Sequence, residues 1–97
     1  MRLRQSSLMN SRVTEDFLVG FAALPDAIKR QAKRAYRMWR QNPSHPSLRF
    51  KRVHVKEPIY SVRVGLGWRV LGLMDGEAIT WFWIGSHADY DRLLKQL

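Results

Sequence analysis

The sequence contains no cysteine, and this absence removes two ways of holding a small protein together. Neither a disulfide framework nor a thiolate zinc site can form, so a hydrophobic core has to stabilise the fold. Ninety-seven residues are enough for one such core and too few for two. We therefore interpret residues 1–97 as a single domain, and the lack of cysteine gives no support for secretion.

Long apolar segments are absent as well. No run approaches the roughly eighteen apolar residues that a membrane-spanning helix needs. The basic start of the chain, Met1–Ser7, is not followed by the apolar segment of a signal peptide. These absences predict a cytoplasmic protein that does not associate with membranes.

Several motifs of well-known enzyme classes are missing too. The sequence has no H-E-x-x-H motif, no Gly-rich phosphate loop before a helix and no G-x-S-x-G nucleophile turn. It therefore predicts neither a metal site nor a bound small-molecule cofactor. His45, in a proline-rich segment, and His54, on an expected strand, are interpreted as incidental.

Acidic residues are scarce: eight Asp and Glu stand against seventeen Lys and Arg, which gives a net charge of +9. The segment from Lys29 to Lys56 carries ten basic residues and no acidic one. Such a one-sided field favours phosphate-rich or acidic partners, although a charged helix face can also be only a solvated surface. The charge pattern therefore favours nucleic acid or an acidic protein as the partner.

Two helices are expected in the first half of the chain. Residues 1–12 show no periodicity and are interpreted as a flexible tail or a weak edge strand. Thr14 is suited to cap a short helix that turns four residues toward the core: Phe17, Leu18, Phe21 and Ala22. Leu24-Pro25 ends this helix, and Pro25 starts a second one that runs to about Gln41.

The second helix divides into an apolar stripe and a basic surface. The stripe predicted to face the core consists of Leu24, Ile28, Ala32, Ala35, Tyr36 and Trp39. The basic surface consists of Lys29, Arg30, Lys33, Arg34, Arg37 and Arg40.

Four strands and a short helix are expected after the linker Asn42–Ser47, where two prolines prevent the helix from continuing. The expected strands cover residues 48–55, with a bulge near Lys51-Arg52, and then 59–64, 68–73 and 77–84. Residues 89–97 are expected to form a helix with Tyr90, Leu93 and Leu94 on one side. The fold class is therefore α+β, with two helices on an antiparallel sheet.

Turn lengths predict which residues face each other in the sheet. A three-residue turn at Gly65-Leu66-Gly67 places Arg63 opposite Arg69, and a turn at Asp75-Gly76 places Arg69 opposite Phe82. One face then receives Tyr60, Val62, Val64, Trp68, Val70, Ile79, Trp81 and Trp83. The other receives Ser61, Arg63, Arg69, Thr80 and Phe82.

Two guanidinium groups directly across a sheet repel each other. Arg63 and Arg69 can therefore serve a bound anion, or they can merely cover the solvent side and pair with Glu57 and Asp75. His87 follows the last strand, where it can overhang the same face and transfer a proton. The pair, the expected neighbours Lys51-Arg52 and His87 together favour an anion site with a proton donor.

These residues resemble a known family. The resemblance lies in Leu24-Pro25, Asn42–Leu48, Tyr60–Val64, Trp68–Leu71 and Ile84–Tyr90, and it covers about residues 14–94. In order and spacing these segments are similar to the RelE/ParE superfamily of toxins from bacterial type II toxin–antitoxin systems. The resemblance implies two helices packed on an antiparallel sheet and a cognate antitoxin that blocks the site.

In the RelE branch the resemblance implies a metal-independent endoribonuclease that cuts mRNA, commonly on the ribosome. It implies that Arg63 and Arg69 stabilise the transition state and that His87 acts as general acid or base. Tyr90 matches a late aromatic that stacks on a base or transfers a proton. The residues expected to contact RNA are Lys51, Arg52 and Phe82.

The resemblance leaves other functions open. No carboxylate clearly matches the glutamate that some members use as base, and Glu57 is only the nearest. The ParE branch shares the scaffold and acts on DNA gyrase, so a gyrase inhibitor is an alternative, as is a member that only binds its antitoxin. An acidic antitoxin is expected to bind the helix surface that includes Lys33, Arg37 and Arg40, or to add a strand beside residues 48–55.

Overall fold

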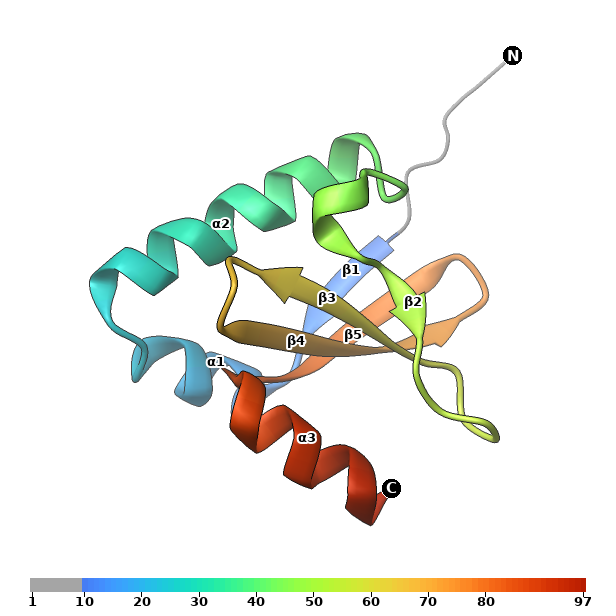
Figure 1. Cartoon of the computed structure of the whole chain (residues 1–97). Coiled ribbons are helices and arrows are strands. Elements are labelled where there is room, and N and C mark those ends of the chain that lie inside the picture. The colour runs from blue at the N-terminus through green and yellow to red at the C-terminus, as the bar shows by residue number, and fades with distance from the viewer. Residues whose placement is uncertain (1–9) are drawn as a thin grey trace.

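The computed structural model describes residues 10–97, and the expectation for residues 1–9 lies outside this range. Its helices and strands form a three-layer arrangement around one sheet (Figure 1). In chain order they are β1 (Asn10–Val13), α1 (Glu15–Ala22), α2 (Asp26–Gln41), the 3-10 helix η2 (Pro46–Leu48), β2 (Lys51–Arg52), β3 (Ile59–Val64), β4 (Trp68–Asp75), β5 (Ala78–Ser86) and α3 (His87–Gln96). The strand order in the sheet is β1-β5-β4-β3-β2.

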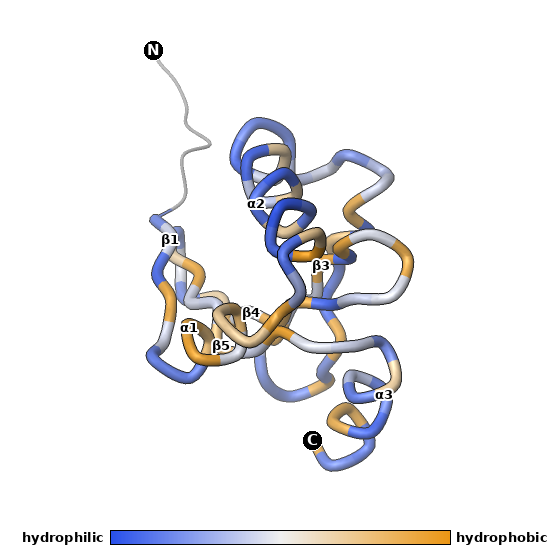
Figure 2. Tube along the Cα trace, turned by 90° about the vertical axis from the view of Figure 1, so that its left-hand side faces the viewer, coloured by the Kyte–Doolittle hydropathy of each residue, from blue (hydrophilic) through white to orange (hydrophobic). Residues whose placement is uncertain are grey.

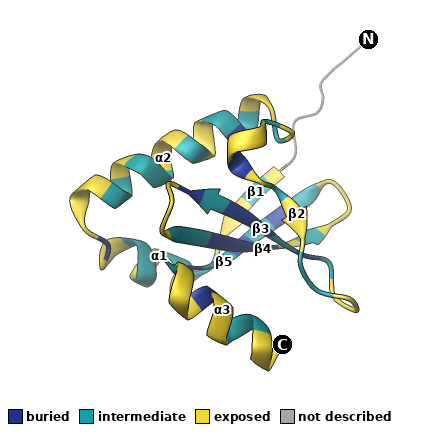
Figure 3. Ribbon diagram, viewed as in Figure 1, coloured by how far each residue is buried: buried dark blue, intermediate teal, exposed yellow. Residues whose placement is uncertain are grey.

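The sheet has a helical layer on each face. Helices α1 and α2 cover one face, and the main core between them and the sheet contains Trp39, Leu48, Ile79 and Trp81. Helix α3 covers part of the other face, where Tyr90 packs with Ile59 and Leu71 in a second, smaller core. Figure 3 shows that exposed residues lie mainly on the outer sides of the helices and on β2.

Both early helices form as the sequence predicts. The Thr14 side chain caps α1 by accepting a hydrogen bond from the Phe17 N–H at 3.0 Å, and α2 begins directly after Pro25. Phe17 and Phe21 pack on the main core, but Leu18 and Ala22 are exposed, against expectation. The eight residues of α1 make about two turns, so only one narrow stripe can reach the sheet.

The first strand is the edge strand that was one of the two expectations for residues 1–12. Asn10–Val13 pairs with β5 in parallel, and the indole N–H of Trp81 donates to the Ser11 hydroxyl at 3.0 Å. The expected fold class is confirmed, but over residues 10–97 the sheet has five strands and is mixed rather than four-stranded and antiparallel.

The strand expected over residues 48–55 is much shorter than predicted. Leu48 lies in η2 and is buried, and Arg49 adopts a left-handed conformation with φ of 46°, so pairing begins only at Lys51 and ends at Arg52. This left-handed residue, rather than a bulge at Lys51-Arg52, changes which side chains face the core. The His54 ring then holds the following loop by accepting bonds from two N–H groups, at Lys56 and Glu57.

The predicted pairing of β3 with β4 is confirmed: Val64 faces Trp68 and Arg63 faces Arg69. The predicted pairing of β4 with β5 is wrong, because Arg69 faces Gly85 and not Phe82. Asp75 pairs with Ala78, so the turn lies one residue later than expected, and a bulge at Leu71/Gly72 adds a further shift. As a result Trp83 faces Leu71 on the second core, not the face covered by α2.

The last helix begins at His87, two residues before the expected start, because the Ser86 side chain caps it. Tyr90, Leu93 and Leu94 face the sheet as predicted. Figure 2 shows α2 as a largely hydrophilic coil lying over hydrophobic strand segments, as an amphipathic surface helix should be. Within residues 10–97, no helix combines the length and hydropathy needed to cross a bilayer.

Candidate anion-binding site

The centre of the candidate site is the turn end of the β3–β4 hairpin, where Arg63 and Arg69 face each other. The Arg63 Nε donates to the Gly65 carbonyl at 3.0 Å, and an Arg69 guanidinium nitrogen donates to the Trp68 carbonyl at 2.8 Å. Gly65 permits this turn because its φ is +59°, in the left-handed region that suits glycine. Both guanidinium groups are thus anchored on one side and keep further N–H donors for a ligand.

The surroundings of Arg69 concentrate positive charge. Partial burial lowers the pKa of Arg69, and the positive charges of Arg63 and then Arg49 lower this pKa further, against the opposing effects of Tyr90 and Asp91. An arginine still remains protonated at neutral pH. Three guanidinium groups in one field, only partly offset by acidic groups, make a site for a polyanion.

Tyr90 joins the sheet to the last helix beneath Arg69. Its side chain is buried, and its hydroxyl donates to the Ser61 hydroxyl at 3.3 Å. The Arg69 guanidinium carbon lies 5.9 Å from the centre of the Tyr90 ring, within the range of a cation–π contact. The His87 ring lies 6.0 Å from the same ring, so Tyr90 connects the arginine cluster with the histidine.

His87 is the first residue of α3 and is paired with a carboxylate. Its Nε2 lies 3.3 Å from the Asp91 Oδ2, one helical turn further on. The side chain of His87 is 48% exposed, so the ring is fixed by Asp91 and remains open to a ligand. A histidine held in this way can give or accept a proton.

The other residues expected to bind RNA differ in their surroundings. Lys51 is exposed and pairs with Ser61, which places it on the face that carries Arg63. Arg52 instead donates to the carbonyls of residues 54, 55 and 56 and so closes a loop. Phe82 packs on the second core and does not face Arg69.

Sequence reasoning missed three residues of this cluster. Asp91 stands four residues after His87, but this spacing marks a pair only once the helix is known to begin at His87 rather than at residue 89. Trp83 was assigned to the wrong face, yet its ring fills the space over Gly85, directly across from Arg69. Arg49 carries no pattern that marks it, because its place depends on a single left-handed residue.

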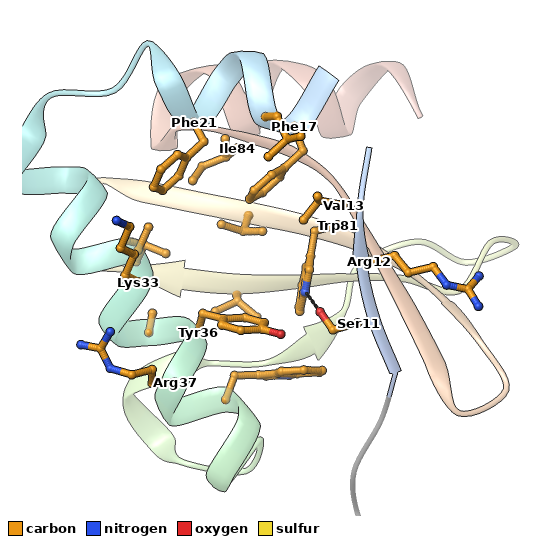
Figure 4. Close-up of a pocket in the computed structure, with 17 residues that line it drawn as sticks. Ser11, Arg12, Val13, Phe17, Phe21, Lys33, Tyr36, Arg37, Trp81 and Ile84 are labelled. Carbon is orange, nitrogen blue, oxygen red and sulfur yellow. Dashed lines mark hydrogen bonds between the residues drawn. The ribbon is translucent and has the colours of Figure 1, made fainter. Parts of the chain in front are cut away.

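Lys33 and Arg37 lie at a different place, on the rim of an apolar groove between α1, α2 and β1 (Figure 4). Phe17, Phe21, Tyr36 and Trp81 contribute aromatic surface to it, and Lys33 and Arg37 rise from α2 beside them. We call this depression the helix groove. Arg40 does not line it.

The sequence and the structure were then compared with known proteins. Residues 26–92 match a family model described as the ParE-like toxin domain. No curated protein matches the sequence significantly. Solved structures with a similar fold include a chain of the archaeal RelE–RelB complex from Pyrococcus horikoshii, with 13% identity, a TM-score of 0.66 and coverage of 81% of this chain and 94% of that chain.

Two further solved structures resemble the chain to a similar degree. YafQ from E. coli is 10% identical, with a TM-score of 0.68 and coverage of 84% of this chain and 97% of that chain. A chain of the toxin–antitoxin complex RelBE2 from Mycobacterium tuberculosis is 17% identical, with a TM-score of 0.65 and coverage of 81% and 98%. At such identities the likeness concerns the fold.

Proposed function

The chain belongs to the ParE-like toxin domain family, and from this premise we propose that it is a toxin that cleaves mRNA as a metal-independent endoribonuclease. The observation that carries the proposal is that Arg69 and His87 both lie beside the Tyr90 ring, with Arg63 facing Arg69 and Asp91 paired with His87. A surface that only binds a protein has no need of an anion site beside an oriented histidine. The ribosome is the expected setting for the cleavage.

The proposed reaction needs only the chain, the RNA and water. The ribose 2′-hydroxyl attacks the adjacent phosphorus and releases its proton to water, the bond from phosphorus to the 5′-oxygen breaks, and that oxygen takes up the proton supplied by the general acid. The products are a 2′,3′-cyclic phosphate and a 5′-hydroxyl. Arg63 and Arg69 stabilise the additional negative charge on the phosphoryl oxygens in the transition state, where fixed donors are most effective.

His87 is the proposed proton carrier. Asp91 holds Nε2, which leaves Nδ1 to donate a proton to the leaving 5′-oxygen. The hydroxyl of Tyr90 is bonded to Ser61 inside the second core. We therefore assign to Tyr90 the support of Arg69 and His87, and to Trp83 the stacking of a base.

The proposed partner is an acidic antitoxin. Related folds come from complexes described as RelE–RelB and as a toxin–antitoxin complex. An amphipathic acidic helix could place its apolar side chains in the helix groove and its carboxylates near Lys33 and Arg37, with Arg40 on the same helix as a further contact. Both mRNA and such a partner would be met in the cytoplasm.

The proposal is tested by mapping cleavage in cells. Primer extension on mRNA after brief induction is expected to show cuts within codons for the wild type. These cuts should fall by two or more orders of magnitude for His87→Ala, since general acid–base catalysis contributes typically about 10²–10⁴-fold. Circular dichroism of both purified proteins checks that the substitution leaves the fold intact.

Two other results would refute the nuclease proposal. Growth arrest with gyrase-dependent DNA damage and no cuts would identify the chain as an inhibitor of gyrase. Intact mRNA and normal growth, together with tight binding of the partner encoded by the adjacent gene, would leave it as a binding module.

A further inference from the structure

A second groove lies beside α2, between this helix and the turn of the β3–β4 hairpin. We propose that this turn groove binds the sugar–phosphate backbone of RNA next to the cleaved phosphate, with Arg34 as its main contact. The inference rests on the proposed nuclease function and adds a binding site to it. Its volume, about 380 Å³, falls within the range of known ligand sites.

Arg63 connects the turn groove with the anion site. It faces Arg69 across the sheet, and it also lines the groove together with Arg34 and Gln31 of α2. An anionic chain bound at Arg69 can therefore continue past Arg63 to Arg34 in the groove. Grooves of this kind follow the backbone of single-stranded nucleic acid.

Both charged residues that line the groove are arginines, which favours phosphate, and they stand beside apolar side chains that include Met38, Leu48 and Leu66. Among residues 10–97, no aromatic ring lines it, so these residues offer bases no stacking platform there. Arg34 is exposed, and Gln31 lies so close to Gly65 that a side chain at residue 65 would collide with its amide oxygen. An exposed guanidinium beside an amide suits contacts to the backbone, which do not depend on base sequence.

Helix α2 thus separates two functions on one basic element. Lys33 and Arg37 line the helix groove, whereas Gln31 and Arg34 line the turn groove. The separation follows from helical geometry, because consecutive residues point about 100° apart. One basic surface can in this way serve a protein partner and RNA at the same time.

The test measures RNA affinity as a function of salt. The probe is a ten-nucleotide RNA of mixed sequence with 2′-O-methyl groups throughout, which cannot be cleaved, and binding is followed by fluorescence anisotropy. Arg34→Ala is expected to weaken binding several-fold and to reduce the slope of log K against log[salt] by about 0.7, the value for one phosphate contact on a single strand. Arg34→Lys should restore the slope.

The matched control is Lys95→Ala, which removes one charge from the end of α3, on the other side of the sheet from α2 (Figure 1). It should leave the slope unchanged. We expect the anion site to hold the few phosphates of a three-nucleotide probe, so wild type and Arg34→Ala should bind it equally well. A defect in Arg34→Ala that appears only with the longer probe therefore locates the contact outside the cleaved phosphate.

Different results overturn different claims. If the wild type binds the ten-nucleotide probe and Arg34→Ala has the same affinity and slope, the turn groove is not an RNA site, and the proposed nuclease still stands. If the wild type binds no RNA probe and cuts no mRNA, the proposed function fails and the turn groove fails with it. An equal loss for Arg34→Ala and Lys95→Ala would show a general effect of net charge, which also overturns the inference.

Discussion

At the scale of single residues, Arg69 is where the site reduces the stability of the folded state. A lowered pKa means that the folded state disfavours the charged guanidinium, first through burial and then through Arg63. This cost to the stability of the folded state is fully present at neutral pH, where both the folded and the unfolded state carry the charge. It would decrease only as the pH rises to the lowered pKa, because the folded state then loses its proton before the unfolded state does. Like charges opposite each other in a sheet destabilise by a few tenths to about 1 kcal/mol. A bound phosphate removes this repulsion, which is a reason for the pair to exist.

Tyr90 allows the roles of its ring and its hydroxyl to be separated. Tyr90→Phe removes the hydroxyl that bonds Ser61, so the free energy of unfolding should fall by about 1 kcal/mol, as for a typical buried hydrogen bond. The ring that supports Arg69 and His87 remains, so cleavage should stay within a few-fold of the wild type. Thermal unfolding and the initial rate on a model RNA measure the two effects.

Tyr90→Leu is the matched comparison, because it removes the ring as well and should lose most of the cleavage. A loss of cleavage in Tyr90→Phe as large as that in His87→Ala would contradict the assigned role. It would mean that the hydroxyl itself transfers a proton.

At the scale of elements, the start of α3 determines where the proposed catalytic groups stand. The Ser86 hydroxyl accepts a hydrogen bond from the Asp89 N–H at 3.1 Å, and the His87 N–H donates to the Gly67 carbonyl at 2.8 Å. The first turn of the helix is thereby fixed both to its own cap and to the β3–β4 turn. His87 and Tyr90 keep their positions relative to Arg69 because of these contacts.

Removal of the cap should therefore affect stability and activity together. Ser86→Ala is expected to lower the free energy of unfolding by about 1 kcal/mol, the usual cost of losing an N-cap. Fraying of the first turn should also reduce cleavage several-fold, because His87 would lose its fixed position. Urea unfolding and cleavage rates would measure both.

Ser86→Asn is the control, since asparagine is also a good N-cap, and it should be near the wild type in both measurements. If Ser86→Ala unfolds more easily but cleaves RNA at the wild-type rate, the position of the first turn does not limit the chemistry.

The sequence predicts these elements well wherever a short-range signal determines them. The three-residue turn between Val64 and Trp68 was enough to pair Arg63 with Arg69, and Pro25 marked the start of α2. The sequence could not predict which β5 residue faces Arg69, because the bulge near Gly72 shifts the pairing of β4 with β5 and depends on packing against Trp81 and Ile79. A small change in register of this kind moves an aromatic side chain from one face to the other.

At the scale of the whole molecule, the sheet separates the two proposed binding surfaces. The helix groove includes Val62, Val64 and Val70 on the face covered by α1 and α2, whereas Tyr90 and Arg69 belong to the face with α3. A partner confined to the helix groove would leave the anion site open. An antitoxin that inhibits cleavage must therefore extend around the edge of the sheet.

The partner could be attracted by the net positive charge of the whole chain or by the basic residues beside the helix groove, and the two cases predict different effects of mutation on the association rate. The combined change Lys33→Glu with Arg37→Glu should lower the association rate with the protein encoded by the adjacent gene by roughly tenfold or more, because steering depends on charge near the docking surface. The effect should shrink at high salt. Lys56→Glu with Lys95→Glu reverses the same amount of charge away from the groove and should have a much smaller effect. Surface plasmon resonance at low and high salt compares the two variants, and equal losses in both would assign the attraction to net charge rather than to the helix groove.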